Sequence, residues 1–440
     1  MDKNLRIVIV GAGMGGLATA LALAKKGFTQ IEVYETASNL GFVGAGIQLA
    51  PNMARILDRL GVWADIDREA VVVSETSIRQ GDEDKELARV DLGYVKKQYG
   101  YPHMVGHRAS LAGSLYEGCK NEPNIKFYFS TSVEDVESFL PKPSIIMKPR
   151  NGEPYTVKAD ILLGADGIKS NTRTAMLKEI NAPDAKVLDT DQAAYRIMLR
   201  REEMAHDPEL LQLIDRDVVT RWIGEKRHII AYPVSNKTIY NISTAQPDKN
   251  FAAGPSATYT TKGSKSAMLG TFGDFCPMIK RMLDLVPDGD VCEWKLRVHS
   301  PLPTWVHGSF ALVGDACHPT LPHLAQGAAQ AIEDAAVLGV VLDKCPDSGP
   351  ESINKSLRVY QELRKDRAET LVELAAANGR DLHLGAGSAK EERDKKFAAL
   401  KDKQGAVPDK WADADVQKMI YGHDCMKEAE EQYQGLFAKL

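Results

Sequence analysis

The chain has 440 residues, of which 44% are hydrophobic and 26% are charged, and its formal net charge at pH 7 is −5. These values are ordinary for a globular protein of two or three domains, and they provide no basic field that would attract nucleic acid or an anionic membrane. The sequence contains no run of about 18 apolar residues, so no membrane span is predicted. The six cysteines are scattered without a C-x-x-C pair, so we expect reduced thiols in an intracellular protein and no metal site.

The first predicted elements form a strand–turn–helix–strand unit. Residues 5–10 are an apolar run, and Gly11-Ala12-Gly13-Met14-Gly15-Gly16 follows directly. A helix is predicted from about residue 14 to 26, and a second strand over residues 31–34 ends at Glu35. A G-x-G-x-x-G turn with an acid about 20 residues further on is typical of dinucleotide binding.

Each part of this unit has a physical task. Gly11 permits the tight turn, Gly13 lets a pyrophosphate approach the backbone, and Gly16 lets the helix pack close to the strand. The helix N-terminus offers free N–H groups and a positive dipole end to the phosphates. Glu35 can accept hydrogen bonds from ribose hydroxyls and disfavours a 2′-phosphate, so the ligand is expected to be FAD-like or NAD-like. The alternative is a glycine-rich turn that binds nothing.

More elements follow before residue 190. Residues 41–49 form a glycine-rich loop or short strand that suits a backbone lying against a flat ligand. Residues 71–80 and 86–92 are predicted to pair as a hairpin. Further expected elements are a helix at 110–119 and strands at 126–130, 144–148 and 157–163, the last ending in Gly164-Ala165-Asp166-Gly167. The nucleotide-binding fold is therefore predicted to be split along the chain.

The pattern changes from about residue 192. The β-rich segments 194–199, 218–223, 227–234 and 238–243 are joined by short turns, which is typical of a mainly antiparallel sheet. Residues 262–285 are predicted to be helical. A buried strand at 310–313 leads into Gly314-Asp315-Ala316, and helices are expected at 327–342 and 357–376 before a charged, helix-prone tail.

Together these elements predict a mixed α/β (α+β) fold with three parts. A Rossmann-like nucleotide-binding domain takes residues 1–190 and 290–345. An inserted antiparallel sheet domain for the substrate takes residues 191–289, and a C-terminal helical region takes residues 346–440. The ligand of the first domain is then expected to meet a substrate held by the second.

Polar and aromatic side chains share one face of a predicted strand. In residues 227–234, His228, Ile230 and Tyr232 alternate with their neighbours and so project together, with His228 and Tyr232 about 13 Å apart. Trp222 of the preceding strand is expected beside them. A His and a Tyr among Ile and Trp suit an aromatic ring that carries a polar group. The alternative is ordinary sheet packing.

Three motifs in a fixed order carry a family resemblance. They are the glycine motif at 11–16, Gly164-Ala165-Asp166-Gly167, and Gly314-Asp315-Ala316-Cys317-His318-Pro319. Over residues 5–380 the chain resembles the single-component FAD-dependent aromatic hydroxylases, which include 4-hydroxybenzoate and salicylate hydroxylases. Residues 322–328 are similar to those of salicylate hydroxylases, 3-hydroxybenzoate 6-hydroxylases and 6-hydroxynicotinate 3-monooxygenases, although many relatives have Gly in place of Ala325.

The resemblance implies roles for five residues around FAD. Arg108 would reach the flavin nucleotide, Asp166 would belong to a motif shared by FAD and NADH binding, and Asp315 would bind ribitol or ribose hydroxyls. Gly327 and Ala328 would open the long helix, with their N–H groups facing the carbonyl edge of the flavin. The alternatives are a surface Arg and ordinary turn residues.

The resemblance also implies an activity. FAD would stay bound noncovalently, NADH would reduce it transiently, and O₂ would supply the oxygen for a small hydroxyaromatic acid. Salicylate would give catechol and CO₂, while 3-hydroxybenzoate and 6-hydroxynicotinate stay open as substrates. A neutral imidazole with a pKa near about 6.5 suits removal of a phenol proton, so His323 and His228 are the candidate bases. Tyr232 would contact the substrate, and Gln326 would either donate to a substrate oxygen or hold its loop.

Two other classes of function stay in view. One is a non-redox protein that binds protein partners on the same fold, and the other is a simple NAD-dependent dehydrogenase. The late Gly314-Asp315 motif argues against both. A cytoplasmic location is expected, although Ala438-Lys439-Leu440 resembles the peroxisomal Ser-Lys-Leu address. The sequence leaves open whether the protein is a monomer or a homodimer.

Overall fold

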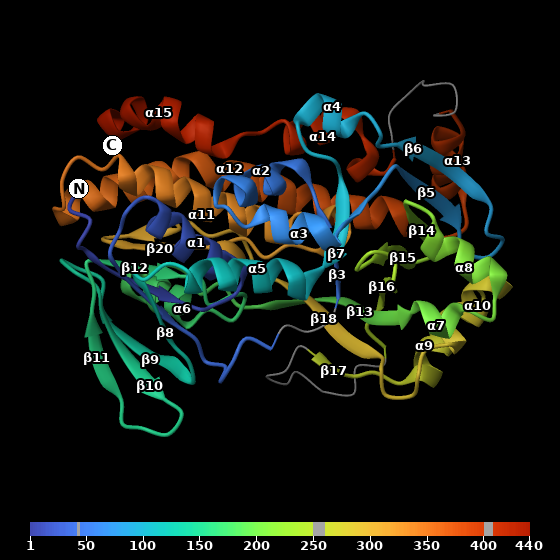
Figure 1. The fold of residues 1–440 in the computed structure, drawn as a ribbon, viewed down its shortest axis with the longest axis horizontal. Helices are drawn as coiled ribbons and strands as arrows, with labels where there is room; N and C mark the ends of the chain where they lie inside the picture. Colours follow the sequence, from blue (N-terminus) through green and yellow to red (C-terminus); the bar gives the residue numbers. More distant parts are fainter. Residues whose placement is uncertain (42–44, 250–259, 400–407) are drawn as a thin grey trace.

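The computed structural model describes residues 1–41, 45–249, 260–399 and 408–440. Residues 42–44, part of the expected glycine-rich loop, lie outside these ranges. Two large sheets occupy the two ends of an elongated molecule, and the long helix α12 (Pro350–Leu382) runs along it (Figure 1). Among the described residues, no helix is both long and apolar enough to cross a membrane.

The first sheet lies in the part of the chain that is predicted to bind a nucleotide. Its six strands stand in the order β19-β20-β12-β1-β2-β8. They are β1 (Arg6–Val10), β2 (Gln30–Tyr34), β8 (Ile125–Tyr128), β12 (Ile161–Gly164), β19 (Val306–His307) and β20 (Phe310–Leu312). β1 pairs in parallel with β2 and β12, and its Ile7, Val8 and Ile9 are fully buried. An apolar run without alternation is what a parallel strand covered on both faces requires.

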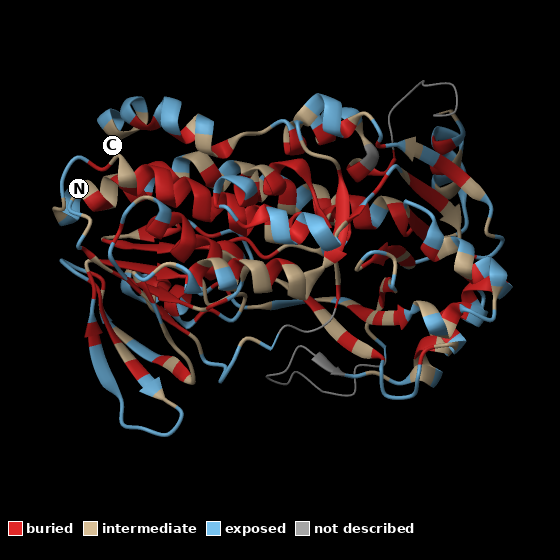
Figure 2. Cartoon of the chain, in the orientation of Figure 1, coloured by how far each residue is buried: buried red, intermediate tan, exposed pale blue. Residues whose placement is uncertain are grey.

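Helices cover this sheet, and several of them begin at residues that are predicted to bind the cofactor. α1 (Met14–Lys25) contacts both α5 (Arg108–Lys120) and α11 (Gly327–Asp343). α11 is buried along nearly its whole length under α12 and α15 (Cys425–Lys439), as Figure 2 shows. The apolar and small residues of α11 explain this burial, because a helix that is hydrophobic all round belongs inside the protein.

The second sheet has eight strands in the order β17-β18-β13-β16-β15-β14-β5-β6. They are β5 (Glu75–Gln80), β6 (Glu86–Asp91), β13 (Leu188–Arg200), β14 (Val218–Gly224), β15 (Arg227–Val234), β16 (Ile239–Pro247), β17 (Thr260–Lys262) and β18 (Cys292–Val298). α8 (Pro208–Asp215), α9 (Lys265–Thr271) and α10 (Pro277–Asp284) supply residues to one hydrophobic cluster with one face of this sheet. The other face carries Ile230 and Tyr232, which the sequence predicts to lie beside the substrate.

The expected limits of the second sheet are too narrow. β5 and β6, the hairpin predicted at 71–80 and 86–92, join this sheet because β14 pairs in parallel with β5. β18 joins it from beyond residue 289. The sheet is therefore not confined to residues 191–289. The helix expected at 262–285 is also two helices, α9 and α10, since Pro277 starts the second one.

Smaller elements complete the fold. β9 (Thr131–Ser138), β10 (Ser144–Pro149) and β11 (Tyr155–Lys158) form one small sheet, and β3 (Gly46–Leu49), β4 (Val71–Val72) and β7 (Met104–His107) form another. The remaining helices are α2 (Pro51–Arg59), α3 (Trp63–Glu69), α4 (Val95–Tyr99), α6 (Asn171–Glu179), α7 (Arg201–Met204), α13 (Ser388–Ala399) and α14 (Ala414–Tyr421). The strand expected at 157–163 is divided between β11 and β12, and α12 is longer at both ends than the predicted helix at 357–376.

Candidate active site

Gly11, Gly13 and Gly16 form the turn between β1 and α1. Gly11 has a φ of +99°, and a Cβ at this position would lie 2.4 Å from the carbonyl oxygen of Ala165. A Cβ on Gly16 would lie 1.9 Å from the carbonyl oxygen of Gly11, so only glycine lets the helix come this close. A Cβ on Gly13 meets nothing within 4 Å, and no side chain caps α1 there. The free N–H groups and the open space fit a pyrophosphate.

Glu35 lies directly after β2 and folds back onto this turn. One carboxylate oxygen accepts the N–H of Ala12 at 2.8 Å, and the other accepts the N–H of Ala37 at 2.8 Å. The carboxylate is thereby fixed beside the turn. A carboxylate has further lone pairs, so the same group can accept hydrogen bonds from a ribose.

Arg108 and Asp315 come from different elements and approach each other. Arg108 is the first residue of α5, and Asp315 lies in the 3-10 turn η1 (Gly314–Ala316) after β20. Burial lowers the pKa of Arg108, and the charge of Asp315 opposes this effect. The protein around Asp315 raises the pKa of its carboxyl, although the residue is exposed to solvent. An exposed acid beside a guanidinium fits a ligand that carries both hydroxyl and phosphate groups.

We expect Asp315→Ala to weaken FAD binding. The substitution removes a charge-assisted hydrogen bond to a sugar hydroxyl, which is worth roughly 1.5–3 kcal/mol. FAD affinity is measured by titrating apoprotein and following flavin fluorescence. Asp290→Ala, at an exposed turn residue, serves as the control. If the Asp315 variant holds FAD as tightly as the control does, Asp315 does not contact the cofactor.

Asp166 is engaged by the start of α6. Its carboxylate accepts the hydroxyls of Ser170 at 2.6 Å and Thr172 at 2.8 Å, and the N–H of Thr172 at 3.0 Å. Arg173, one residue further, donates to the carbonyl oxygens of Ile168 at 2.8 Å and Ala316 at 3.0 Å. The loop after β12 and the loop after β20 are therefore held together, which sequence reasoning did not anticipate.

The turn before α11 has a strained residue. Ala325, which follows the 3-10 turn η2 (Pro322–Leu324), adopts a left-handed conformation with φ 53° and ψ 34°. Gln326 precedes the helix without a side-chain cap, so the first N–H groups of α11, at Gly327 and Ala328, stay available to a ligand. This geometry fits the carbonyl edge of a flavin ring and explains why glycine suits position 325.

We expect Ala325→Gly to leave the free energy of unfolding unchanged or to raise it by up to about 1 kcal/mol, because glycine relieves the left-handed strain. Ala175→Gly, in the middle of α6, is the matched control and should lower the free energy of unfolding by about 1 kcal/mol. Denaturant unfolding of both variants measures the difference. Equal losses would show that Ala325 is not strained.

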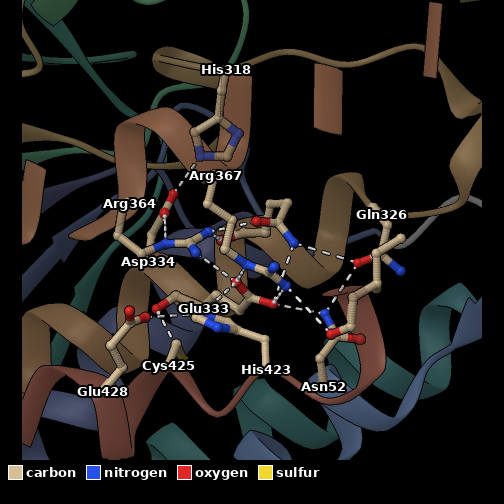
Figure 3. A network of polar contacts seen from close by, with 12 residues as sticks. Asn52, His318, Gln326, Glu333, Asp334, Arg364, Arg367, His423, Cys425 and Glu428 are labelled. Atoms are coloured by element: carbon tan, nitrogen blue, oxygen red, sulfur yellow. Dashed lines mark hydrogen bonds and ion pairs between the residues drawn. The ribbon is translucent and has the colours of Figure 1, made fainter. Parts of the chain in front are cut away.

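Gln326 lies at the edge of a buried polar network (Figure 3). Its side-chain oxygen accepts the amide of Asn52 at 3.1 Å, and Asn52 also donates to Glu333 at 2.7 Å. Glu333 is buried and paired with Arg364 and Arg367. These contacts engage the side-chain oxygen of Gln326 and fit the loop-holding role, while donation from its amide nitrogen to a substrate stays a prediction.

His228, Ile230 and Tyr232 share the face of β15 that points away from the α8–α10 cluster, as alternation predicts. Trp222 does not join them, so that expectation was wrong. Trp222 pairs with Ile229 across β14 and β15, and therefore lies on the opposite face. Its indole N–H donates to Asp84 at 2.7 Å. The error arose because the side-chain period gives faces within a strand, while the pairing register decides which faces coincide.

The same register places Arg196 on the sheet face that carries His228, Ile230 and Tyr232. Arg196 pairs with Ser243 of β16, and Ser243 pairs with Ile230 of β15, so the three side chains lie in one row across the sheet. The guanidinium lies 4.9 Å from the ring centre of Trp294. Burial, aided by the charge of Arg108, lowers the pKa of Arg196 to about 10. Among the described residues, no carboxylate pairs with this cation.

Tyr232 and Asn241 border the row occupied by Arg196. They pair across β15 and β16, and the side-chain oxygen of Asn241 accepts the N–H of Gly46 at 2.7 Å. A Cβ on Gly46 would lie 2.7 Å from the ring of Tyr232, so glycine is required where β3 meets the second sheet. Burial raises the pKa of Tyr232 above its usual range, and the phenol is therefore neutral at pH 7.

Three buried imidazoles meet at the end of this face. His228 and His383 are hydrogen-bonded, with 2.6 Å between Nδ1 and Nε2. The ring of His323 lies 5.5 Å from that of His228 and 5.6 Å from that of His383. Burial lowers the pKa of His323 to about 3 and that of His383 to about 4, and it holds the pKa of His228 well below its usual range. All three imidazoles are neutral at pH 7.

A buried ion pair lies behind the imidazoles. Arg221 of β14 donates to Asp409 at 2.9 Å, and both side chains are almost wholly inaccessible. Asp409 also accepts the side-chain amide of Asn378 at 3.1 Å, and Asn378 donates to the carbonyl of His323 at 2.9 Å. The tail of the chain, which carried no recognisable motif, thus closes the back of the site.

Sequence reasoning missed the residues that the site recruits from a distance: Arg196, Arg221, Asn241, His383 and Asp409. Arg196 stands in a predicted strand, and its parity together with the register would have placed it. His383 lies beyond the helix predicted at 357–376, and Asp409 lies in the charged tail, where no periodicity indicates a partner. A role in the site can be assigned to a single buried His or Asp only once its contacts are known.

Comparisons with known proteins agree with this geometry. The family model described as "FAD binding domain" matches residues 4–244 and 293–375. An FAD-dependent monooxygenase of Beauveria bassiana is 32% identical over 434 residues, covering 97% of both chains, and a 3-hydroxybenzoate 6-hydroxylase of Aquipseudomonas alcaligenes is 34% identical over 83% of this chain and 86% of its own. A salicylate hydroxylase structure has a TM-score of 0.78 at 22% identity and covers 100% of this chain and 99% of its own. The chain belongs to the FAD-dependent aromatic hydroxylases and is a flavoprotein monooxygenase.

Proposed function

We propose that the enzyme hydroxylates a small aromatic acid that carries a phenol, with NADH as reductant. Salicylate is the first candidate, and it would be converted to catechol with release of CO₂. The alternatives are 3-hydroxybenzoate, hydroxylated at carbon 6, and 6-hydroxynicotinate, hydroxylated at carbon 3. The proposal rests on two groups that lie on the same face of the sheet. One is the guanidinium of Arg196, which has no carboxylate partner among the described residues, and the other is the neutral imidazole of His228.

Arg196 accounts for the acid group of the substrate. A partly buried cation without a carboxylate partner is costly, and an anionic ligand that binds beside it would remove this cost. The planar guanidinium matches a carboxylate through two parallel hydrogen bonds. The ring centre of Trp294 lies 4.9 Å from the guanidinium, and this cation–π contact would help to orient it.

His228 accounts for activation of the phenol. Its Nδ1 is engaged by His383, which leaves Nε2 to accept a proton from a substrate hydroxyl. A phenolate pushes electron density to its ortho and para carbons, where an electrophilic oxygen attacks. In salicylate the carboxyl-bearing carbon is ortho to the hydroxyl, so attack there is followed by loss of CO₂.

The glycine turn, Glu35, Arg108 and Asp315 would hold FAD, which supplies the activated oxygen when it is bound and reduced. Ile230, which shares a face of β15 with His228 and Tyr232, would pack against the substrate ring, and the buried imidazoles would exclude water. Tyr232, a neutral phenol, can donate to a substrate oxygen. The preference for NADH over NADPH is part of the proposal and rests on the family resemblance.

The test is turnover of NADH with salicylate, 3-hydroxybenzoate and 6-hydroxynicotinate, with the product identified by mass. Product has to be measured because NADH oxidation without hydroxylation gives the same absorbance change. If none of the three acids gives a hydroxylated product, the proposed substrate class is wrong.

Arg196→Met should raise KM for the preferred acid by about 10²–10³-fold, because a charge-assisted bidentate pair is lost. It should raise KM much less for the corresponding amide, which has no charge to lose. The ratio of the two kcat/KM values measures recognition of the carboxylate. Arg150→Met, at an exposed turn residue outside the second sheet, controls for loss of a cation elsewhere. An unchanged acid-to-amide ratio would remove Arg196 from substrate binding.

A further inference from the structure

The hydrogen bond between His228 and His383 joins two distant parts of the chain. His228 lies on β15, and His383 follows the last residue of α12. Nδ1 of His228 is 2.6 Å from Nε2 of His383, and their exposed fractions are 4% and 9%. Between two neutral imidazoles one ring must donate and the other must accept, so the two tautomers are coupled.

The role proposed above for His228 fixes both tautomers, and the inference rests on that role. If Nε2 of His228 is to accept a substrate proton, it must begin unprotonated, and the ring hydrogen must lie on Nδ1. His228 then donates to Nε2 of His383. His383 must in turn carry its own hydrogen on Nδ1.

The surroundings do not stabilise a proton on this pair. His383 faces the cations Arg221 of β14 and Arg393 of α13, and both lower its affinity for a proton. His228 faces Arg221, His323 and His383, and Asp409, the buried acid behind them, is already paired with Arg221. An imidazolium formed on His228 would therefore be short-lived, and its proton has to move on.

The chain reaches the protein surface just after His383. Residues 384 and 385 are partly exposed, and residues 386–389, which follow them, are exposed. The nearby Gly385 packs against Glu225, whose carboxyl carbon would be 2.7 Å from a Cβ at that position. Glu225 is itself exposed, so the end of α12 lies beside an acid in contact with water. His323, in contrast, is 1% exposed and neither of its ring nitrogens has a partner.

We propose that His383 is a proton-relay residue that carries the substrate's phenolic proton from His228 to solvent. The phenol O–H bond breaks as a hydrogen bonds to Nε2 of His228. The hydrogen on Nδ1 of His228 passes to Nε2 of His383, and the hydrogen on Nδ1 of His383 passes to water. One proton leaves the substrate and one enters the solvent, so both rings end neutral.

The reverse transfer completes the cycle. After the forward relay both imidazoles carry their hydrogen on Nε2, which is the wrong state for a second substrate. Donation from Nε2 of His228 to the product oxygen, with uptake of one proton from water by Nδ1 of His383, restores the starting tautomers. The pair therefore serves both deprotonation of the substrate and protonation of the product.

Proton release on substrate binding tests the relay without turnover. The FAD-loaded enzyme is mixed with the acid that it hydroxylates, in weak buffer with a pH indicator and without NADH. The parental protein should release one proton per site. His383→Gln still accepts the hydrogen bond from Nδ1 of His228 through its amide oxygen but cannot pass a proton on, so release should slow by about 10-fold or more. Substrate affinity and FAD content should stay within a factor of about 2 of the parent.

His103→Gln is the matched control, because His103 is also buried with its pKa lowered to about 3, but its ring contacts Trp411 and Tyr421 and none of the three imidazoles. It should release protons at the parental rate. Because a variant can fail to fold, the parental enzyme is also measured in mixtures of H₂O and D₂O. Two hydrogens moving together make the rate of release a curved function of deuterium content.

Several outcomes would overturn the relay. A parental rate of release in His383→Gln, or a linear dependence on deuterium in the parent, would show that His383 passes no proton. An enzyme that hydroxylates an acid but releases no proton on binding it would also refute the relay while leaving the proposed function intact. Failure to hydroxylate any of the acids would instead refute the proposed function, and the relay with it.

Discussion

Replacement of His228 by Gln is expected to slow hydroxylation by a factor of about 10²–10⁴, which is the usual contribution of a general base. His228 has Nε2 directed by its bond to His383, and it shares a strand face with Tyr232 and a sheet face with Arg196. Without the imidazole, the phenol has to ionise by itself. The rate should therefore recover in part as the pH approaches the pKa of a simple phenol, about 10.

The measurements are product formation against pH, flavin content and melting temperature. NADH oxidation should continue in His228→Gln while product falls, because the loss affects the substrate and not the cofactor. His307→Gln, at the far edge of the first sheet, is the control and should keep parental rates. If both variants keep parental rates at all pH values, Tyr232 or ionisation in solvent replaces His228 as the means of activation.

The pH dependence of stability gives a second signature of the same residue. The pKa of His228 in the folded protein lies well below the value of about 6.5 that an unfolded imidazole has. Its contribution to stability is therefore complete above about pH 6.5, and it is lost as the pH falls toward the folded pKa. His228→Gln should lose less stability than the parent between pH 6.5 and pH 5, whatever its effect on catalysis.

The cofactor side of the site follows from local patterns in the sequence. The backbone neighbours that require Gly11 and Gly16 are close in the chain or follow an adjacent strand. The spacing of the glycine motif alone therefore predicts their positions. The substrate side depends on register. Parity placed His228 with Tyr232, but it could not place Trp222 or Arg196, because these positions depend on how β13, β14, β15 and β16 pair.

The back of the site could not be predicted for another reason. Asp409 reaches Arg221 across 188 residues, and His383 reaches His228 across 155. No period or motif links such positions, because each contact arises from the packing of whole helices. The tail was expected only to be charged and helix-prone, whereas a few of its residues, Asp409 and Trp411 among them, are buried against the site.

Arg364→Met is expected to lower the free energy of unfolding by about 3–5 kcal/mol, because it removes one partner from a buried ionic network. Arg364 is fully buried and donates to Asp334 at 2.9 Å, to Glu333 at 2.5 Å and to the side chain of Gln330 at 2.7 Å (Figure 3). Burial alone would raise the pKa of Glu333, but the charges of Arg367 and Arg364 outweigh it and hold the pKa well below its usual range.

The same substitution should also weaken FAD binding, although Arg364 does not reach the site. Asp334 accepts the N–H of Gly314 at 3.0 Å and pairs with His318 at 2.6 Å, so it fixes the loop that presents Asp315. Loss of Arg364 removes a positive charge next to Asp334, so the pKa of Asp334 should rise. Flavin content after gel filtration, together with denaturant unfolding, measures both effects.

The pH dependence separates this network from a simple packing defect. The carboxylates of the parent have folded pKa values below the unfolded ones, so the stability that they contribute is present above about pH 4.5 and is lost as the pH falls further. The difference between Arg364→Met and the parent should therefore be largest at pH 7 and should shrink toward acid. Arg358→Met, an exposed position on the same helix, should stay near the parent throughout. A constant difference across pH would mean that Arg364 acts through its volume and not through its charge.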